Sequence, residues 1–264
     1  MHVYVEGVGV RGPGLDGWQH ARDALAGTVP YEARTTLVPL CPQLPPVERR
    51  RTVASVNLAL AVGMEALANA ERPSADLPAV FSSSCGDGAT IHEIIEVLNS
   101  PERAVSPIRF HNSVHNAPAG YWGIATRSRE ASTSLCCYDA SFSAGLLEAA
   151  VLVTVERCPV ILVVYDMPYP EPLHQVRPIA APFGMALVLG ALPSPRTRAV
   201  LSIELSASSQ GPSTLAEAAL EDLRQNNPAA RGLPLLVTLA TRSSAELAVD
   251  YVAGNQLQVG VRPC

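Results

Sequence analysis

The residues best placed to do chemistry lie in the stretch STSLCCYDASFSAGLLEAA, residues 132–150. The pattern predicts a strand that runs directly into the start of a helix. The first turn of a helix has unpaired N–H groups, and together with the helix dipole these stabilise negative charge. The stretch therefore predicts a place for an activated nucleophile, with Cys136, Cys137 and Ser141 as the candidates.

Each candidate also has a structural interpretation. Cysteine is among the residues most often buried, so Cys136 and Cys137, pointing to opposite faces of the predicted strand, fit core packing. Asp139 fits an ordinary N-cap of a helix that begins at about residue 140 or 141. Ser141 and Ser143 could attack only with a base nearby, and the chain lacks the G-x-S-x-G turn that presents a nucleophilic serine.

His111 and His115 are the two histidines that lie close together in the sequence. Their spacing of four residues would place both on one face of a helix. Asp87 or Glu93 could supply a third metal ligand, but the chain has no H-E-x-x-H motif and no C-x-x-C pair. The sequence therefore predicts neither a metal site nor a cofactor. An alternative role for residues 111–116 is to satisfy buried backbone groups.

The elements that must hold these residues alternate between strands and helices. A run of β-branched residues over 159–166 is typical of a strand buried on both faces. It should lie parallel to the strand over 132–138, joined to it by a helix over 140–156. Asp16 is a plausible cap for the helix that follows it. Further strands are predicted over 2–14, 77–84, 184–191, 199–207 and 233–240, and further helices over 16–27, 47–71, 89–100 and 213–226.

This pattern predicts one α/β domain over the whole chain of 264 residues, with a mixed central sheet covered by helices. Hydrophobic residues make up 48% of the chain and charged residues only 16%, so a sizeable core is available and part of the surface suits a partner. The net charge of −5, with arginine supplying all 19 basic residues, argues against nucleic-acid binding. The sequence predicts no signal peptide and no membrane span, and its free cysteines fit a cytoplasmic protein.

Several blocks of the chain, in order, resemble the β-ketoacyl synthases. That family has counterparts of VYVEGVGVRGPGLDGWQHARDALAG, FSSSCGDG, SPIRFHNSVHNAPAGYWGIAT, EASTSLCCYDASFSAGLLEAA and APFGMALVLG. The resemblance covers about residues 1–205, while residues 206–264 are divergent and too short for a complete second half. It is closest to the short subfamily called chain length factors of aryl polyene clusters. The resemblance implies a thiolase-like fold formed by a single, truncated ketosynthase half.

Two departures from the family bear on function. Aligned on the helix, the position of the attacking cysteine falls on Asp139, and Cys137 lies two residues too early. Ketosynthases also use two histidines from their second half, and this chain has no histidine after Gly190. An ionised aspartate is a poor nucleophile toward a thioester compared with a thiolate. The resemblance therefore implies a ketosynthase-like subunit without the catalytic residues, with Asp139 at a vestigial nucleophile position.

The resemblance also implies a partner, because family members pair through the strand that leads to the nucleophile. It implies a heterodimer with an active β-ketoacyl synthase, whose acyl tunnel this chain would shape, and indirect contact with an acyl carrier protein. The implied interface and tunnel residues are Phe110, Asn112, Ser113, Val114, His115, Asn116, Ser134, Leu135, Cys136, Cys137 and Tyr138. Two alternatives remain: an acyl-thioester hydrolase or transferase using Cys137 or Ser141 with one of the two close histidines, and a homodimeric acyl-binding module.

Overall fold

A computed structural model of the chain describes residues 1–73, 77–207 and 210–264. The strands are β1 His2–Gly12, β2 Leu15–Asp16, β3 Ala79–Ser82, β4 Ser132–Leu135, β5 Val160–Asp166, β6 Phe183–Gly190, β7 Ala199–Ala207, β8 Ala245–Asp250 and β9 Asn255–Pro263. The helices are α1 Trp18–Leu25, α2 Pro46–Arg49, α3 Ala54–Ala70, α4 Gly88–Leu98, α5 Pro107–Asn112, α6 Ala117–Thr126, α7 Ser141–Glu156, α8 Leu173–Val176, α9 Ala218–Gln225 and α10 Leu233–Thr241.

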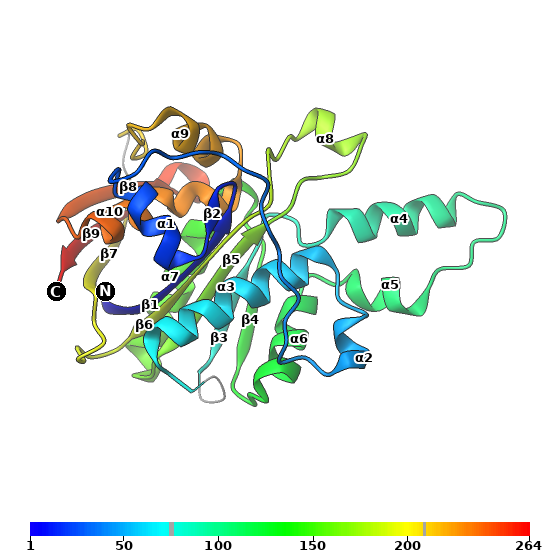
Figure 1. Cartoon of the computed structure of the whole chain (residues 1–264), viewed down its shortest axis with the longest axis horizontal. Helices are drawn as coiled ribbons and strands as arrows, with labels where there is room; N and C mark the ends of the chain where they lie inside the picture. The colour runs from blue at the N-terminus through cyan, green and yellow to red at the C-terminus, as the bar shows by residue number, and fades with distance from the viewer. Residues whose placement is uncertain (74–76, 208–209) are drawn as a thin grey trace.

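Within the described residues, the strands form one sheet in the order β4-β3-β5-β6-β1-β7-β9-β8, with β2 paired to β1. β3 lies parallel to both β4 and β5, and the remaining neighbours are antiparallel, so the sheet is mixed. Helices cover both faces of the sheet, with α3 on one side and α7 on the other (Figure 1). The predicted α/β class, with a mixed sheet covered by helices, is confirmed.

β5 shows why the sheet has a core on each face. Val160, Leu162 and Val164 belong to the cluster that contains α7 residues, whereas Ile161, Val163 and Tyr165 belong to the cluster that contains α3 residues. Successive side chains of a strand point to opposite faces, so a strand covered on both sides must be apolar throughout. The predicted parallel arrangement of this strand with residues 132–135 is confirmed through their shared neighbour β3.

Two glycines of β1 let α3 lie close to the sheet. A Cβ atom at Gly7 would come within 2.1 Å of the Ala66 carbonyl oxygen, and one at Gly9 within 2.1 Å of the Val62 carbonyl oxygen. Both distances are far below van der Waals contact, so only a residue without a side chain fits at either position. This close approach allows α3 to bury most of its length against β1, β5 and β6.

Several predicted elements are wrong in type or extent. Residues 233–240 form helix α10 rather than a final strand, and the last two strands are β8 and β9. The run LPLLVTLA has no period of two or 3.6, so periodicity alone could not separate a buried helix from a buried strand. The predicted helix over 47–71 is two helices, α2 and α3, and the predicted helix over 213–226 is confined to α9.

The predicted helix cap at Asp16 is also wrong. Asp16 lies in β2, and α1 begins after Gly17, which has φ 99° and no capping side chain. Gly17 takes this position because the backbone there has a positive φ, which glycine adopts without a steric penalty.

One helical stretch of the described chain, Tyr138–Glu156, meets the length and hydropathy expected of a membrane span. It consists of α7 and the 3-10 turn before it, and 56% of its most apolar window is buried inside the protein. α7 packs against β3 and β5 in the centre of the molecule (Figure 1). Burial of a core helix accounts for its apolar composition.

Candidate functional site

The junction between β4 and α7 is a sharp turn at one edge of the sheet. After β4, Cys136 and Cys137 lead into a 3-10 turn over Tyr138–Ala140, and α7 starts at Ser141. Tyr138 has φ 52°, the left-handed region that a non-glycine residue adopts only under strain. In a nucleophile elbow the residue at such a strained strand-to-helix turn carries the attacking group.

Backbone geometry and the sequence resemblance thus place the nucleophile position at two adjacent residues. Geometry favours Tyr138 as the residue at the apex of the turn, and the resemblance assigns the nucleophile position to Asp139. Neither residue carries a thiol. The interpretation of Asp139 as an N-cap is wrong, because the residue before α7 is Ala140, without a capping side chain, and the Asp139 carboxylate has another partner.

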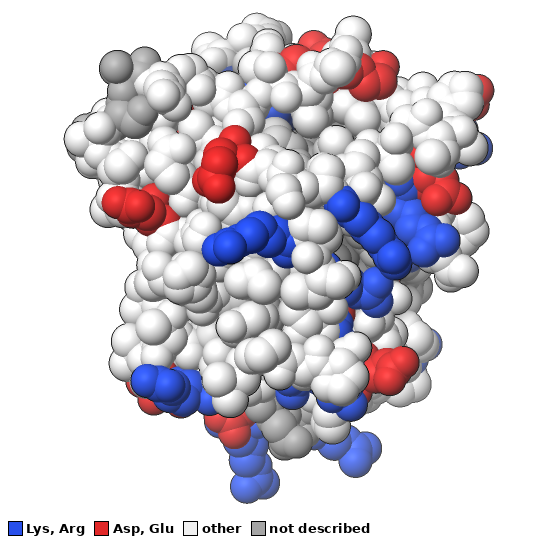
Figure 2. All heavy atoms as spheres, turned by 90° about the vertical axis from the view of Figure 1, so that its left-hand side faces the viewer, with Lys and Arg blue, Asp and Glu red and all other residues white. Residues whose placement is uncertain are grey.

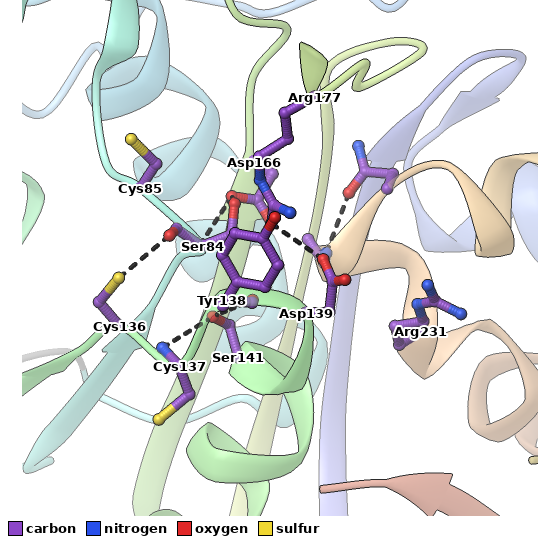
Figure 3. Close-up of polar contacts among 12 residues, drawn as sticks. Ser84, Cys85, Cys136, Cys137, Tyr138, Asp139, Ser141, Asp166, Arg177 and Arg231 are labelled. Carbon is purple, nitrogen blue, oxygen red and sulfur yellow. Dashed lines mark hydrogen bonds and ion pairs between the residues drawn. The ribbon is translucent and has the colours of Figure 1, made fainter. Parts of the chain in front are cut away.

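That partner is Arg177, from the loop between β5 and β6 that contains α8 (Figure 3). Arg177 Nη2 donates to Asp139 Oδ1 at 2.9 Å, and the guanidinium carbon lies 3.3 Å from the centroid of the Tyr138 ring. Its Nε donates to the Tyr169 hydroxyl at 3.4 Å. Burial opposes the charge of Arg177, but its hydrogen bonds to Tyr169 and Asp139 outweigh this and raise its pKa. Arg177 therefore stays cationic and joins the loop to the turn.

A second polar group lies behind the turn, at the end of β5. Asp166 is fully buried, and its Oδ1 accepts hydrogen bonds from the Ser84 N–H at 2.8 Å, the Ser84 hydroxyl at 2.7 Å and the Ser83 hydroxyl at 3.1 Å. Burial raises the pKa of this carboxyl to about 6, although the hydrogen bonds from Ser84 oppose the shift. Asp166 thus fixes the turn after β3 against β5.

The structural interpretation predicted that Cys136 and Cys137 pack in the core, and this prediction is wrong. β4 ends at Leu135, so neither cysteine lies in the strand; Cys136 is exposed and Cys137 is half-buried. The Cys136 thiol donates to the Ser84 carbonyl at 3.0 Å. Burial raises the pKa of the Cys137 thiol, and the neighbouring Cys136 raises it further. Cys137 is therefore less ionised at neutral pH than a free cysteine, which is the opposite of an activated nucleophile.

Ser141 is held by the backbone of the turn. Its hydroxyl donates to the Tyr138 carbonyl at 2.8 Å and accepts from the Cys137 N–H at 3.1 Å, and the side chain is fully buried. These two hydrogen bonds stabilise the turn, and they use both the proton and a lone pair of the hydroxyl. In the described part of the chain, neither His111 nor His115 hydrogen-bonds to Ser141 or to Cys137.

The two histidines also do not share a helical face. α5 ends at Asn112, so only His111 lies on it, packed edge to face against Tyr121. His115 Nε2 lies 3.3 Å from the Ser83 carbonyl oxygen, in agreement with a role in satisfying backbone groups. Across residues 1–73, 77–207 and 210–264, no three His, Cys, Asp or Glu side chains are grouped as a metal site would need.

The remaining predicted interface residues fall in two groups. Ser134 and Leu135 belong to β4, the edge strand of the sheet. Phe110, on α5, is 67% exposed, and Val114, in the turn after α5, is 49% exposed. Helices α4 and α5 project from the body of the molecule (Figure 1). Asn112 is buried instead: its Nδ2 donates to the Arg51 carbonyl at 2.7 Å, and its Oδ1 accepts from the Tyr121 hydroxyl at 3.1 Å. Ser113 and Asn116 lie in the turn that follows α5.

Sequence reasoning missed the residues that organise the turn. One feature of the sequence could have pointed to Asp166: it is a lone carboxylate at the end of a buried strand, directly after six apolar residues. No feature of the sequence pointed to Arg177, since it lies 38 residues from Asp139 in an irregular loop.

One protein family matches most of the chain. Residues 18–249 match the family described as beta-ketoacyl synthase, N-terminal domain. The chain belongs to this family. Most of its length is covered by the match, which includes the turn between β4 and α7. Comparison with curated proteins finds no match.

Solved structures share the fold of this ketoacyl synthase family member along its full length. A chain of a ketosynthase in complex with its chain length factor from Xenorhabdus doucetiae is 22% identical, with a TM-score of 0.74 over 98% of this chain and 99% of that chain. A chain of the ishigamide ketosynthase/chain length factor is 13% identical, with a TM-score of 0.74 over 100% and 99%. A type II polyketide synthase acyl-carrier protein in complex with its ketosynthase contains a chain that is 10% identical, with a TM-score of 0.77 over 100% and 99%.

Proposed function

We propose that this chain is a non-catalytic chain length factor. In this proposal it pairs in the cytoplasm with an active β-ketoacyl synthase and shapes the acyl tunnel of that partner in aryl polyene biosynthesis. The observation that carries the proposal is the ion-paired carboxylate of Asp139, beside Tyr138, at the turn where a condensing enzyme needs a thiolate. Structures of ketosynthases with their chain length factors share the fold, which supports the same kind of pairing.

The side chains around the turn support a non-catalytic role. A thioester condensation needs a nucleophile of low pKa and groups that stabilise the oxyanion. The pKa of the Cys137 thiol is raised, the Ser141 hydroxyl is held by backbone groups, and no histidine follows Gly190 in the sequence. These observations also disfavour the alternative of an acyl-thioester hydrolase that uses Cys137 or Ser141.

The free edge of β4 supports pairing with another chain. On its inner side, the carbonyl of Ala131, just before β4, accepts a hydrogen bond from Ala79 N–H, and the carbonyl of Leu135 accepts one from Ser83 N–H, just after β3. Backbone groups of a strand point alternately to its two neighbours, so the N–H and C=O groups of Ser132 and Ser134 point to the outer side. A partner strand could bond there and extend the sheet, which is how the family resemblance implies that subunits pair.

Exposed apolar side chains on the projecting helices α4 and α5 also favour an interface with a partner. Among the side chains of α4, only Thr90 is buried. The exposed large apolar residues on α4, α5 and the turn after α5 are Ile91, Ile95, Leu98, Ile108, Phe110 and Val114. We call this set the apolar arm. Soluble monomers rarely expose large apolar patches, and a subunit interface would cover these side chains.

The proposal is tested by co-expressing the chain with an active ketosynthase of the aryl polyene type and measuring the complex by native mass spectrometry. We expect a one-to-one heterodimer for the native chain. Ser134→Pro removes an outward N–H group without removing any hydrogen bond to β3, so it should lower the fraction of heterodimer about tenfold or more. Ser134→Ala keeps the N–H group and should pair like the native chain.

Two results would contradict the proposal. One is a stable monomer that binds no ketosynthase, and the other is a heterodimer that forms equally well with Ser134→Pro. Intact-mass analysis after treatment with an acyl thioester tests the enzyme alternative. Stoichiometric acylation of Cys137 or Ser141 would support that alternative, and the proposed function predicts no acylation. An acyl carrier protein would meet the pair through the ketosynthase, in line with the complex of such a carrier with its ketosynthase.

A further inference from the structure

A cleft of about 780 Å³ lies on the face of the molecule that carries both ends of the described chain. Its walls come from α1, the end of α3, the connection between β6 and β7, and the end of α10. Four arginines from three of these segments line it: Arg22, Arg196, Arg198 and Arg242. Figure 2 shows arginine side chains gathered across this face. The apolar arm lies at the opposite end of the molecule (Figure 1).

Arg198 is held in a fixed position at the cleft. Its Nε donates to the Glu6 carbonyl at 3.0 Å, and its Nη2 donates to the Asn69 carbonyl at 2.9 Å. A guanidinium has five N–H groups, so three remain for a ligand. Burial lowers the pKa of Arg198, and the positive charges of Arg242 and Arg22 lower it further. Arg198 is therefore close enough to Arg22 and to Arg242 for their charges to repel its own, and the Glu71 carboxylate partly offsets this repulsion.

The cleft contains more positive than negative side chains. Asp23 Oδ1 lies 3.4 Å from Arg22 Nε, and Glu71 is the second acidic side chain of the lining. Within the described residues, the side chains of Arg196 and Arg242 make no hydrogen bond and no ion pair within 4 Å. The charge of Arg196 also acts on the Glu6 carboxylate, which is already paired with Arg72. The whole chain carries a net charge of −5, so this positive cleft is opposite in sign to the molecule around it. An anion bound here would relieve the repulsion among the arginines.

We propose that this cleft binds a small organic anion that carries more than one phosphate group. Guanidinium groups bind phosphate through two parallel hydrogen bonds, and several phosphates in one ligand could contact arginines from separate segments at once. A volume of about 780 Å³ lies within the range of small-molecule sites. Nucleoside polyphosphates and coenzyme A share this chemistry. The proposal does not depend on the proposed pairing, because no residue that lines the cleft belongs to β4 or to the apolar arm.

The test is isothermal titration calorimetry of the full chain, or of its complex with a ketosynthase, at low salt. Three probes are titrated: ATP, coenzyme A and inorganic tripolyphosphate. We expect saturable binding of at least one probe, and binding should weaken when salt rises from about 50 to about 200 mM. Arg242→Ala should weaken binding about tenfold. The relative affinities of the three probes then identify the nucleoside, the pantetheine part or the phosphates alone as the source of recognition.

Arg157→Ala is the matched control, because Arg157 and Arg242 are both exposed residues with positive φ, 56° and 50°, directly after a helix. The two substitutions therefore have the same backbone cost and remove the same charge. Binding should be unchanged in Arg157→Ala. If Arg242→Ala does not fold, Arg22→Ala takes its place. Equal loss of affinity in the control and the cleft variant, or no binding of any probe at low salt, would overturn the proposal.

Discussion

At the scale of single residues, Arg177 decides the chemistry of the turn before α7. It contacts Asp139 through an ion pair, Tyr138 through its ring face, and Tyr169 through a hydrogen bond. A cation held in this way beside the start of a helix would stabilise a thiolate placed next to it. The turn therefore has an electrostatic environment suited to a nucleophile, while the two residues of the turn that Arg177 contacts, Tyr138 and Asp139, carry no thiol.

We predict that Asp139→Cys creates a reactive thiol. The cationic Arg177 should lower the pKa of the new thiol, so iodoacetamide should label it at least about tenfold faster than Cys137 at neutral pH. Labelling is measured by intact mass and peptide mapping. The control Asp139→Cys/Arg177→Gln should react at a rate close to that of Cys137. Equal rates with and without Arg177 would show that this arginine does not set the electrostatics of the turn.

At the scale of elements, the contact between β1 and α3 depends on two glycines. A methyl group at Gly9 would overlap the Val62 carbonyl oxygen, which belongs to the backbone of α3 and cannot move without shifting the helix. Close packing of this kind makes an added methyl group destabilising. The contact is important because α3 covers the face of β5 that contains Tyr165.

Gly9→Ala should lower the free energy of unfolding by about 2 kcal/mol or more, measured by chemical denaturation. Gly120→Ala is the control, because Gly120 is an exposed helical residue of α6 with no atom within 4 Å of the added Cβ. Alanine favours a helix over glycine, so this control should be neutral or more stable by up to about 1 kcal/mol. A tolerated alanine at residue 9 would contradict the close packing of α3 on β1.

At the scale of the whole molecule, the apolar arm projects at one end, and the segments that line the arginine-lined cleft lie at the other (Figure 1). A partner that covers the arm would leave the cleft at the other end open to solvent. Because the arm is exposed in the isolated chain, the chain should associate with itself when no partner is present.

Phe110→Glu should reduce that self-association and also weaken pairing with a ketosynthase. The free energy of unfolding should change by only about 0.5 kcal/mol or less, since Phe110 is 67% exposed. Val155→Glu is the matched control, because Val155 is also 67% exposed but lies on α7, outside the arm. Analytical ultracentrifugation measures both effects. Equal changes in the two variants would assign self-association to general hydrophobicity rather than to the arm.

The sequence by itself determined the α/β class, because strands buried on both faces must be apolar throughout and the run over 159–166 meets that condition. Through the family resemblance, it also predicted that the position of the attacking cysteine falls on Asp139. It did not determine whether residues 233–240 are helix or strand, since a uniformly apolar run has no period. Only the tertiary structure placed Arg177 beside Asp139 and brought Arg22, Arg198 and Arg242 into one cleft. These residues are far apart in the chain, and contacts between distant segments leave no local pattern in the sequence.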